Sequence, residues 1–133
     1  MSVLVAFDGV LQTDLGAPLF DGILLTRSLL AGSRVVIASN TPLEEVEHFL
    51  RTENITGVSK VYGETPVLEA LREERMQASV SMVFTAEPYT ALTVAQQGVT
   101  ICLINASNFV RPDWKPNRKS WEEIANANHF SRG

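Results

Sequence analysis

The sequence lacks most of the features that mark common protein classes. Its single cysteine, Cys102, cannot form a disulfide within the chain, and its His and Cys residues do not have zinc-site spacing. Neither G-x-G-x-x-G nor G-x-x-x-x-G-K-[ST] occurs, which argues against a dinucleotide-binding or P-loop protein. The early apolar run, residues 3–7, is too short to span a bilayer and follows no basic region. We therefore expect a cytoplasmic protein without a signal peptide or membrane anchor.

The composition is typical of one globular domain. The 133 residues are 45% apolar and 20% charged, a balance that favours a folded chain over a disordered one. The net charge of −4 disfavours nucleic acid and acidic membranes as partners. Residues 1–104 carry 6 basic and 12 acidic residues, whereas residues 105–133 carry 5 and 3. Any contact with an anion would therefore favour the C-terminal segment.

Apolar runs alternate with amphipathic segments along residues 1–104. The runs are rich in β-forming residues and predict strands buried on both faces, and the segments between them predict helices. The expected strands are 3–7, 34–38, 59–62, 80–84 and 99–104, and the expected helices begin near residues 19, 42, 66 and 88. This order predicts a three-layer α/β/α sandwich around a five-stranded parallel sheet.

The local sequence patterns predict a structural role for several side chains. Thr41 and Glu44 have the spacing of a capping box at the start of the second helix. The charged run Arg72–Arg75 is expected to face solvent, and Cys102 is expected to fill the core of its apolar strand. Glu87 is expected in the first turn of the fourth helix, where the helix dipole favours a carboxylate. A catalytic role for Glu87 is the alternative.

Polar residues gather where the expected strands end. Ligands of open parallel sheets bind beyond the carboxyl ends of the strands, where the strand order reverses. Asp8 and Gly9 follow the first strand, and Ser39 and Asn40 follow the second. The next helix directs its free amides at this place, so these four residues, together with Lys60 of the third strand, are candidate ligands of an anion. The alternative is structural, with Asp8 accepting hydrogen bonds within its own loop.

Two of these segments resemble motifs of the haloacid dehalogenase superfamily of phosphohydrolases. The first motif of that family is an apolar strand followed by D-x-D-G-[TV]-[LV], and residues 3–11 read VLVAFDGVL. The second is an apolar strand ending in Ser or Thr, often followed by Asn, and residues 35–40 read VVIASN. The phrase VAQQGV at residues 94–99 fits the same register. The resemblance covers about residues 2–104 and implies the strand order 5-4-1-2-3, and the short connections leave no room for a cap domain.

The positions that carry the chemistry of this family are changed. By resemblance, Ala6 stands where the family has its nucleophilic and metal-binding Asp. Ala86 and Thr90 stand at further metal-binding carboxylates, and Thr65 stands where a Lys precedes a proline. Magnesium needs hard oxygen ligands that include one or two carboxylates, so no metal cofactor is expected. Loss of a nucleophile from a concerted catalytic unit costs on the order of 10⁶ in rate.

The changes favour a catalytically degenerate haloacid dehalogenase-like domain without phosphatase activity. Such a domain would bind a partner or an anionic ligand, because capless members of the family use large substrates or a partner chain as a lid. The alternative is a divergent phosphohydrolase in which Asp8 is catalytic, and only this alternative requires Mg²⁺. By resemblance, an acid two residues after the nucleophile donates a proton. Two residues after Asp8 the chain has Val10, which has no proton to donate. A third hypothesis is a module that binds a small ligand or nucleotide without chemistry.

The C-terminal residues 105–133 have a composition of their own. They predict an extended segment and then a short helix that opens with a capping box at Ser120. Trp114 and Trp121 are interleaved with basic residues. We expect both indole rings to pack on the domain formed by residues 1–104. The alternatives are a protein partner or self-association through this basic tail, and the net charge makes nucleic acid unfavourable.

Overall fold

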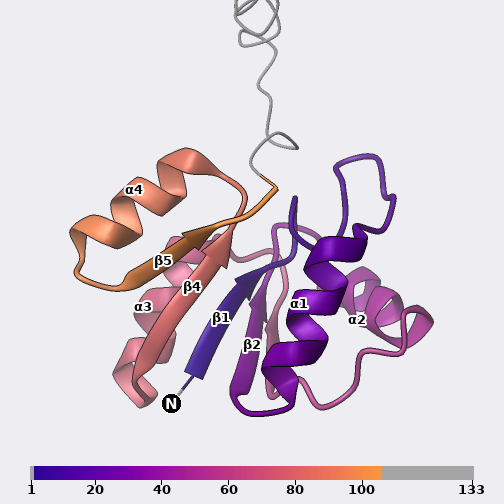
Figure 1. Cartoon of the computed structure of the whole chain (residues 1–133), viewed down its shortest axis with the longest axis horizontal. Coiled ribbons are helices and arrows are strands. Elements are labelled where there is room, and N and C mark those ends of the chain that lie inside the picture. Colours follow the sequence, from indigo (N-terminus) through magenta and orange to yellow (C-terminus); the bar gives the residue numbers. More distant parts are fainter. Residues whose placement is uncertain (1, 106–133) are drawn as a thin grey trace, which may run out of the picture.

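The computed structural model describes residues 2–105, which form a parallel α/β sandwich (Figure 1). Its elements are β1 (Ser2–Ala6), α1 (Phe20–Leu30), β2 (Arg34–Ala38), α2 (Leu43–Thr52), β3 (Lys60–Tyr62), α3 (Val67–Gln77), β4 (Val80–Thr85), α4 (Pro88–Gln96) and β5 (Thr100–Leu103). All strand pairs are parallel, in the order β3-β2-β1-β4-β5. The predicted fold class and strand order are confirmed. Within the described residues the longest connection runs from Phe7 to Leu19, too short for a cap domain.

Helices cover the sheet from both sides. Side chains of α1 and α2 share one core cluster with Val5 and Phe7, and side chains of α3 and α4 share the other with Leu4 and Val36. Within β1, Val3 and Val5 belong to the first cluster and Leu4 between them belongs to the second, because successive side chains of a strand point to opposite faces of the sheet. Every residue of β1 is buried, so the central strand is covered on both sides. Figure 1 shows α1 in front of the sheet and α3 behind it.

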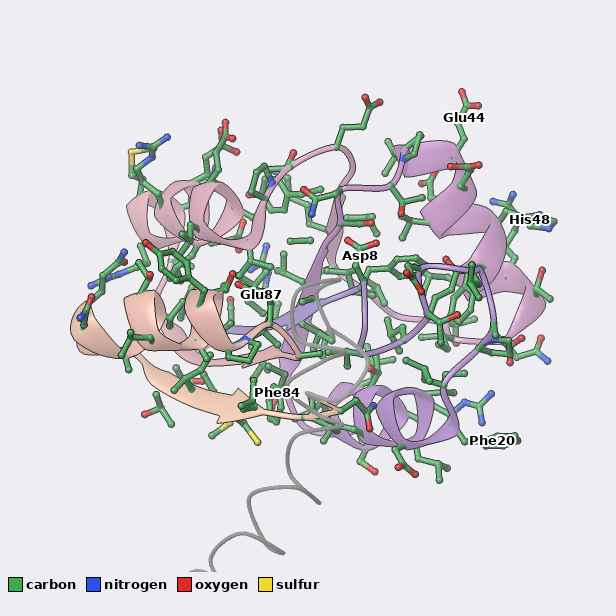
Figure 2. All side chains as sticks on the ribbon, turned by 90° about the horizontal axis from the view of Figure 1, so that it is seen from above. Asp8, Phe20, Glu44, His48, Phe84 and Glu87 are labelled. Atoms are coloured by element: carbon green, nitrogen blue, oxygen red, sulfur yellow. The ribbon has the colours of Figure 1, made fainter. Side chains whose placement is uncertain are left out.

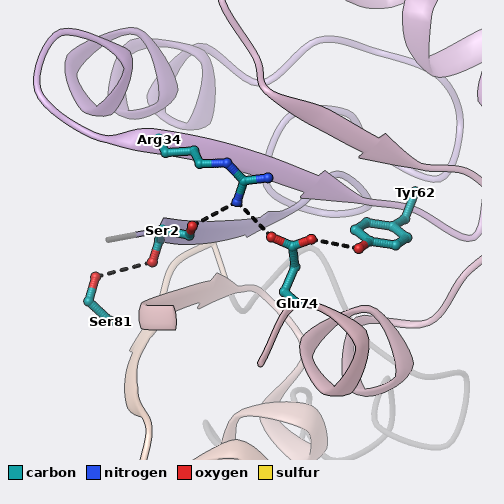
Figure 3. A network of polar contacts seen from close by, with 5 residues as sticks. All are labelled: Ser2, Arg34, Tyr62, Glu74 and Ser81. Carbon is teal, nitrogen blue, oxygen red and sulfur yellow. Dashed lines mark hydrogen bonds and ion pairs between the residues drawn. The ribbon is translucent and has the colours of Figure 1, made fainter. Parts of the chain in front are cut away.

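The charged run on α3 is not uniformly exposed, which corrects the prediction for Arg72–Arg75. Glu74 is only 1% exposed and faces the sheet. Its carboxylate accepts hydrogen bonds from Arg34 of β2 at 2.7 Å and from the Tyr62 hydroxyl of β3 at 2.6 Å (Figure 3). The same Arg34 nitrogen donates to the Ser2 hydroxyl at 2.7 Å. Glu74 is buried because partners from two strands neutralise and satisfy its carboxylate.

The prediction that Cys102 fills the core is not borne out by residues 2–105. Among these residues Cys102 is exposed, because β5 is the edge strand of the sheet and the helix of residues 2–105 that covers it lies on one side only. No helix within residues 2–105 has the length and apolar character needed to cross a membrane. The predicted extended segment and helix of the C-terminal residues, with Trp114 and Trp121, lie outside the described residues.

Candidate functional site

A tight turn after β1 holds Asp8 at the carboxyl edge of the sheet. The carbonyl oxygen of Phe7 accepts backbone hydrogen bonds from Val10, Leu11 and Gln12, at 3.3, 2.9 and 3.3 Å. Gly9 has φ of 82°, in the left-handed region that glycine adopts without strain. The turn buries Gly9 and leaves Asp8 partly exposed. Gly9, predicted as a site residue, thus contributes the backbone shape that orients Asp8.

The loop between β2 and α2 supplies the groups that face Asp8. The amide of Ser39 donates to the carbonyl of Tyr62 at 2.9 Å, and the amide of Thr65 donates to the carbonyl of Ser39 at 2.8 Å. These two bonds tie the loop to the end of β3. The Ser39 hydroxyl accepts from the amide of Thr41 at 2.8 Å. The loop is thereby fixed with its hydroxyl groups and the amide of Asn40 toward β1.

Both oxygens of the Asp8 carboxylate accept hydrogen bonds from this loop. The Ser39 hydroxyl lies 3.3 Å from Oδ2 and 3.5 Å from Oδ1, and the amide of Asn40 donates to Oδ2 at 2.9 Å. The Thr41 hydroxyl donates to Oδ1 at 3.0 Å. Three donors near the start of α2 therefore surround one carboxylate, which is the arrangement expected for a bound anion at a helix N-terminus. Asp8 itself is that anion.

Thr41 is a residue of the site that the sequence analysis did not predict there. The expected capping box is absent, since α2 begins after Pro42 and has no side-chain cap, while the Thr41 hydroxyl bonds to Asp8. The available signal was the run of three hydrogen-bonding side chains, Ser39, Asn40 and Thr41, directly after a buried strand. The structure brings together four of the residues predicted for the site (Asp8, Gly9, Ser39 and Asn40) and adds Thr41 to them.

An acidic cleft opens beside Asp8. It has a volume of about 930 Å³ and lies between the loop of residues 12–18 and the outer face of α2. The carboxylates that line it are Asp8, Asp14, Glu44, Glu45 and Glu53, and no Lys or Arg is among its lining residues. Seen from above, Asp8 lies near the middle of the carboxyl edge, with Glu44 and His48 of α2 on one side and Glu87 on the other (Figure 2). The field in this cleft disfavours a phosphate ester.

Lys60 lies apart from this arrangement. Its ammonium group is placed over the ring of Tyr62, 4.5 Å from the ring centroid. Tyr62 in turn bonds to Glu74 on the α3 side of the sheet. The structure therefore gives Lys60 a cation–π partner and no hydrogen bond to Asp8.

Glu87, Ala6 and Ala86 have structural roles. The Glu87 carboxylate caps α4 by accepting from the amides of Tyr89 and Thr90, at 3.1 and 2.6 Å, and from the Thr90 hydroxyl at 2.6 Å. Glu87 was expected in the first turn of this helix and lies directly before it, as the N-cap residue. Ala6 and Ala86 are 4% and 0% exposed and present no polar side-chain atom.

The donor set does not fit a magnesium ion. Within residues 2–105, no three His, Cys, Asp or Glu side chains come together as a metal site. Asp8 is the one carboxylate at the end of β1, and both its oxygens already accept hydrogen bonds. Magnesium needs near-octahedral oxygen coordination with carboxylate ligands, and these residues do not supply it.

Comparisons with protein-family models, curated proteins and solved structures found no match to this chain. The chemistry of the site therefore rests on its own residues. They hold one carboxylate in place with three donors at the mouth of an acidic cleft. Among the described residues, no second acid or base is in hydrogen-bond contact with Asp8.

Proposed function

We propose that the chain is a non-catalytic haloacid dehalogenase-like domain that acts in the cytoplasm by binding a partner. The observation that carries the proposal is the set of donors around Asp8. The Ser39 hydroxyl, the Asn40 amide and the Thr41 hydroxyl are the groups that would bind a phosphate at this edge, and they bind Asp8 instead. An intramolecular carboxylate at this place competes with any phosphate ester for the same donors.

The replaced catalytic positions support the same proposal. In the resemblance, Ala6 takes the place of the nucleophile, and its methyl group belongs to the hydrophobic core. Thr90 stands at the place of a metal-binding Asp, and its hydroxyl donates a hydrogen bond to Glu87, the cap of α4. Covalent phosphoryl transfer needs a nucleophilic side chain that faces the bound phosphate, and the methyl group of alanine is not a nucleophile.

The chemistry of the cleft favours a partner with a basic surface. Five carboxylates line it, and Glu44 and Glu45 lie exposed on the first turn of α2. Such a field attracts Lys and Arg side chains and raises the rate at which a basic protein segment associates. The cleft is also open to solvent, since the described residues include no cap domain.

The absence of catalysis is tested with a phosphatase screen and magnesium calorimetry on the same metal-stripped protein. We expect no Mg²⁺ binding in the presence of phosphate. We also expect no hydrolysis of an aryl phosphate, or of a panel of phosphate esters, above that of the Asp8→Asn variant. Turnover that requires Mg²⁺ and disappears in Asp8→Asn would instead support the alternative of a phosphohydrolase that uses Asp8.

Binding of a basic segment is tested with a fluorescent Lys-rich peptide and anisotropy. We expect the double variant Glu44→Gln, Glu45→Gln to weaken binding about fivefold, because each exposed charge contributes roughly 0.5 kcal/mol. The matched control is Glu64→Gln, Glu69→Gln, which removes two exposed carboxylates outside the cleft. Equal weakening by the two double variants would mean that the peptide senses net charge and not the cleft.

A further inference from the structure

Residues 2–105 leave one part of the sheet uncovered on the side of α1 and α2. Met82 pairs with Thr100 and Phe84 pairs with Cys102, so these four side chains share one face of β4 and β5. Met82 and Phe84 contact the core cluster that α1 and α2 also join, whereas Val83 belongs to the cluster of α3 and α4. In Figure 2, α4 lies on one side of β5, and no helix of residues 2–105 lies on the other.

The exposure of β5 conflicts with its composition. Its sequence Thr-Ile-Cys-Leu is followed by Ile104, an apolar pattern typical of a parallel strand covered on both faces. Cys102 and Thr100 are nevertheless exposed, and Met82 beside them is only partly buried. On the opposite face, Ile101 packs with the cluster that contains Val94 of α4. Residues 2–105 thus supply no covering layer on the α1 side of β4 and β5, although they cover the rest of the sheet.

The chain continues from this edge into the segment best suited to cover it. We propose that residues 106–133 of the same molecule pack on the α1 side of β4 and β5 and bury Cys102 and Met82, with an indole ring as the main contact. The sequence places both tryptophans of the chain in this segment, Trp114 and Trp121. These are its largest apolar side chains, and burying one removes about 150–250 Å² from water.

The connection is also short enough for this arrangement. Leu103 ends β5, and residue 106 begins the segment three positions later. Neighbouring strands lie about 4.8 Å apart, and an extended residue spans about 3.3 Å, so a few residues bring the chain back over β4. A tether of this length gives the segment a millimolar effective concentration at its own sheet. Packing within one molecule is therefore favoured over exchange with a second copy.

Cys102 and the two tryptophans make the proposal testable in the full-length chain. Cys102 is the only cysteine, so its reaction with a thiol reagent reports directly on the covered face. We expect the thiol to react about tenfold more slowly in the native chain than in urea, and Trp121→Ala or Trp114→Ala to remove most of that protection. Reaction at the unfolded rate would overturn the proposal. Protection lost on dilution would also overturn it, because the cover would then be a second copy.

A charge on the same face provides an independent readout. Cys102→Glu places a carboxylate on an exposed position, so the domain should still fold, and we expect the tryptophan emission to shift to longer wavelength as the indole becomes solvated. The matched control is Leu92→Glu, on an exposed position of α4 at 57% relative exposure, which should leave the emission unchanged. An unshifted emission in Cys102→Glu, or an equal shift in both variants, would overturn the proposal.

Discussion

Glu74 is a buried carboxylate whose burial depends on two partners. Burial raises the pKa of Glu74, but the hydrogen bonds from Arg34 and Tyr62 and the charge of Arg34 outweigh it and hold that pKa below its ordinary value. Burial, the hydrogen bond to Glu74 and its negative charge raise the pKa of Tyr62. The network joins α3 to β2 and β3 (Figure 3). Because Arg34 is partly exposed and only Glu74 is fully buried, removing one partner of this network costs about 1–3 kcal/mol, the penalty of a buried group left without its donor.

The lowered pKa of Glu74 predicts a loss of stability in acid. A carboxyl whose pKa is depressed by folding contributes stability above its unfolded value of about 4.3, and this contribution falls as the pH drops through the lower folded pKa. Glu74→Gln should therefore flatten the acid limb of unfolding free energy against pH, measured by urea denaturation between neutral pH and about pH 2.5. Glu69→Gln, an exposed carboxylate on the same helix, should keep the acid limb of the native chain. The assignment fails if both variants behave alike.

Gly22 is required by the approach of α1 to the turn after β1. A Cβ atom at this position would lie 1.6 Å from the carbonyl oxygen of Val10, which belongs to backbone and cannot rotate away. We expect Gly22→Ala to lower the free energy of unfolding by about 3 kcal/mol or more, measured by urea denaturation. Gly32→Ala is the control, because nothing lies within 4 Å of its added Cβ. A neutral Gly22→Ala would mean that α1 packs elsewhere.

At the scale of elements, the start of α2 and the end of β1 together form an anion site filled by the chain itself. Asp8→Ala would free the Ser39 and Thr41 hydroxyls and the amide of Asn40. We expect phosphate to stabilise this variant and not the native chain. At about ten times the dissociation constant, the gain is about 1.4 kcal/mol, or several degrees in Tm.

The control for this element is Asp14→Ala. It removes a carboxylate that also lines the cleft but makes no hydrogen bond to the loop between β2 and α2. We would measure thermal unfolding of the native chain, Asp8→Ala and Asp14→Ala with and without phosphate. This comparison distinguishes a general effect of removing negative charge from phosphate binding at the site of Asp8. If Asp14→Ala responds as strongly as Asp8→Ala, the effect is general screening of acidic charge, and the donors around Asp8 do not form an anion site.

At the scale of the whole molecule, the described residues form a sheet on which α3 and α4 cover one face, whereas α1 and α2 cover only part of the other. If residues 106–133 complete that layer, the chain unfolds as one cooperative unit. Far-ultraviolet circular dichroism follows the helices of residues 2–105, and fluorescence follows the two tryptophans. We expect the two urea transitions to coincide. A fluorescence transition at lower urea would show that the segment separates before the domain unfolds.

Much of the fold could be predicted because its signals are local. The apolar runs and helix starts lie within a few residues of one another, so strand and helix identity, the parallel sheet and the carboxyl edge as the place of the site all follow from short patterns, whereas the strand order was implied by the resemblance. Asp8, Ser39 and Asn40 were predicted at that edge for the same reason. Thr41 was assigned to a capping box because its true partner, Asp8, lies 33 residues away.

The sequence by itself therefore determined the elements, their order along the chain and the polar edge of the sheet. Only the tertiary structure decided which charges and hydroxyls meet. Glu74 lies within a charged run, and its burial follows from Arg34 and Tyr62, 40 and 12 residues away. Cys102 lies within an apolar strand, and its exposure among residues 2–105 follows from the place of β5 at the sheet edge. Both outcomes depend on neighbours distant in sequence, and periodicity along one segment carries no information about them.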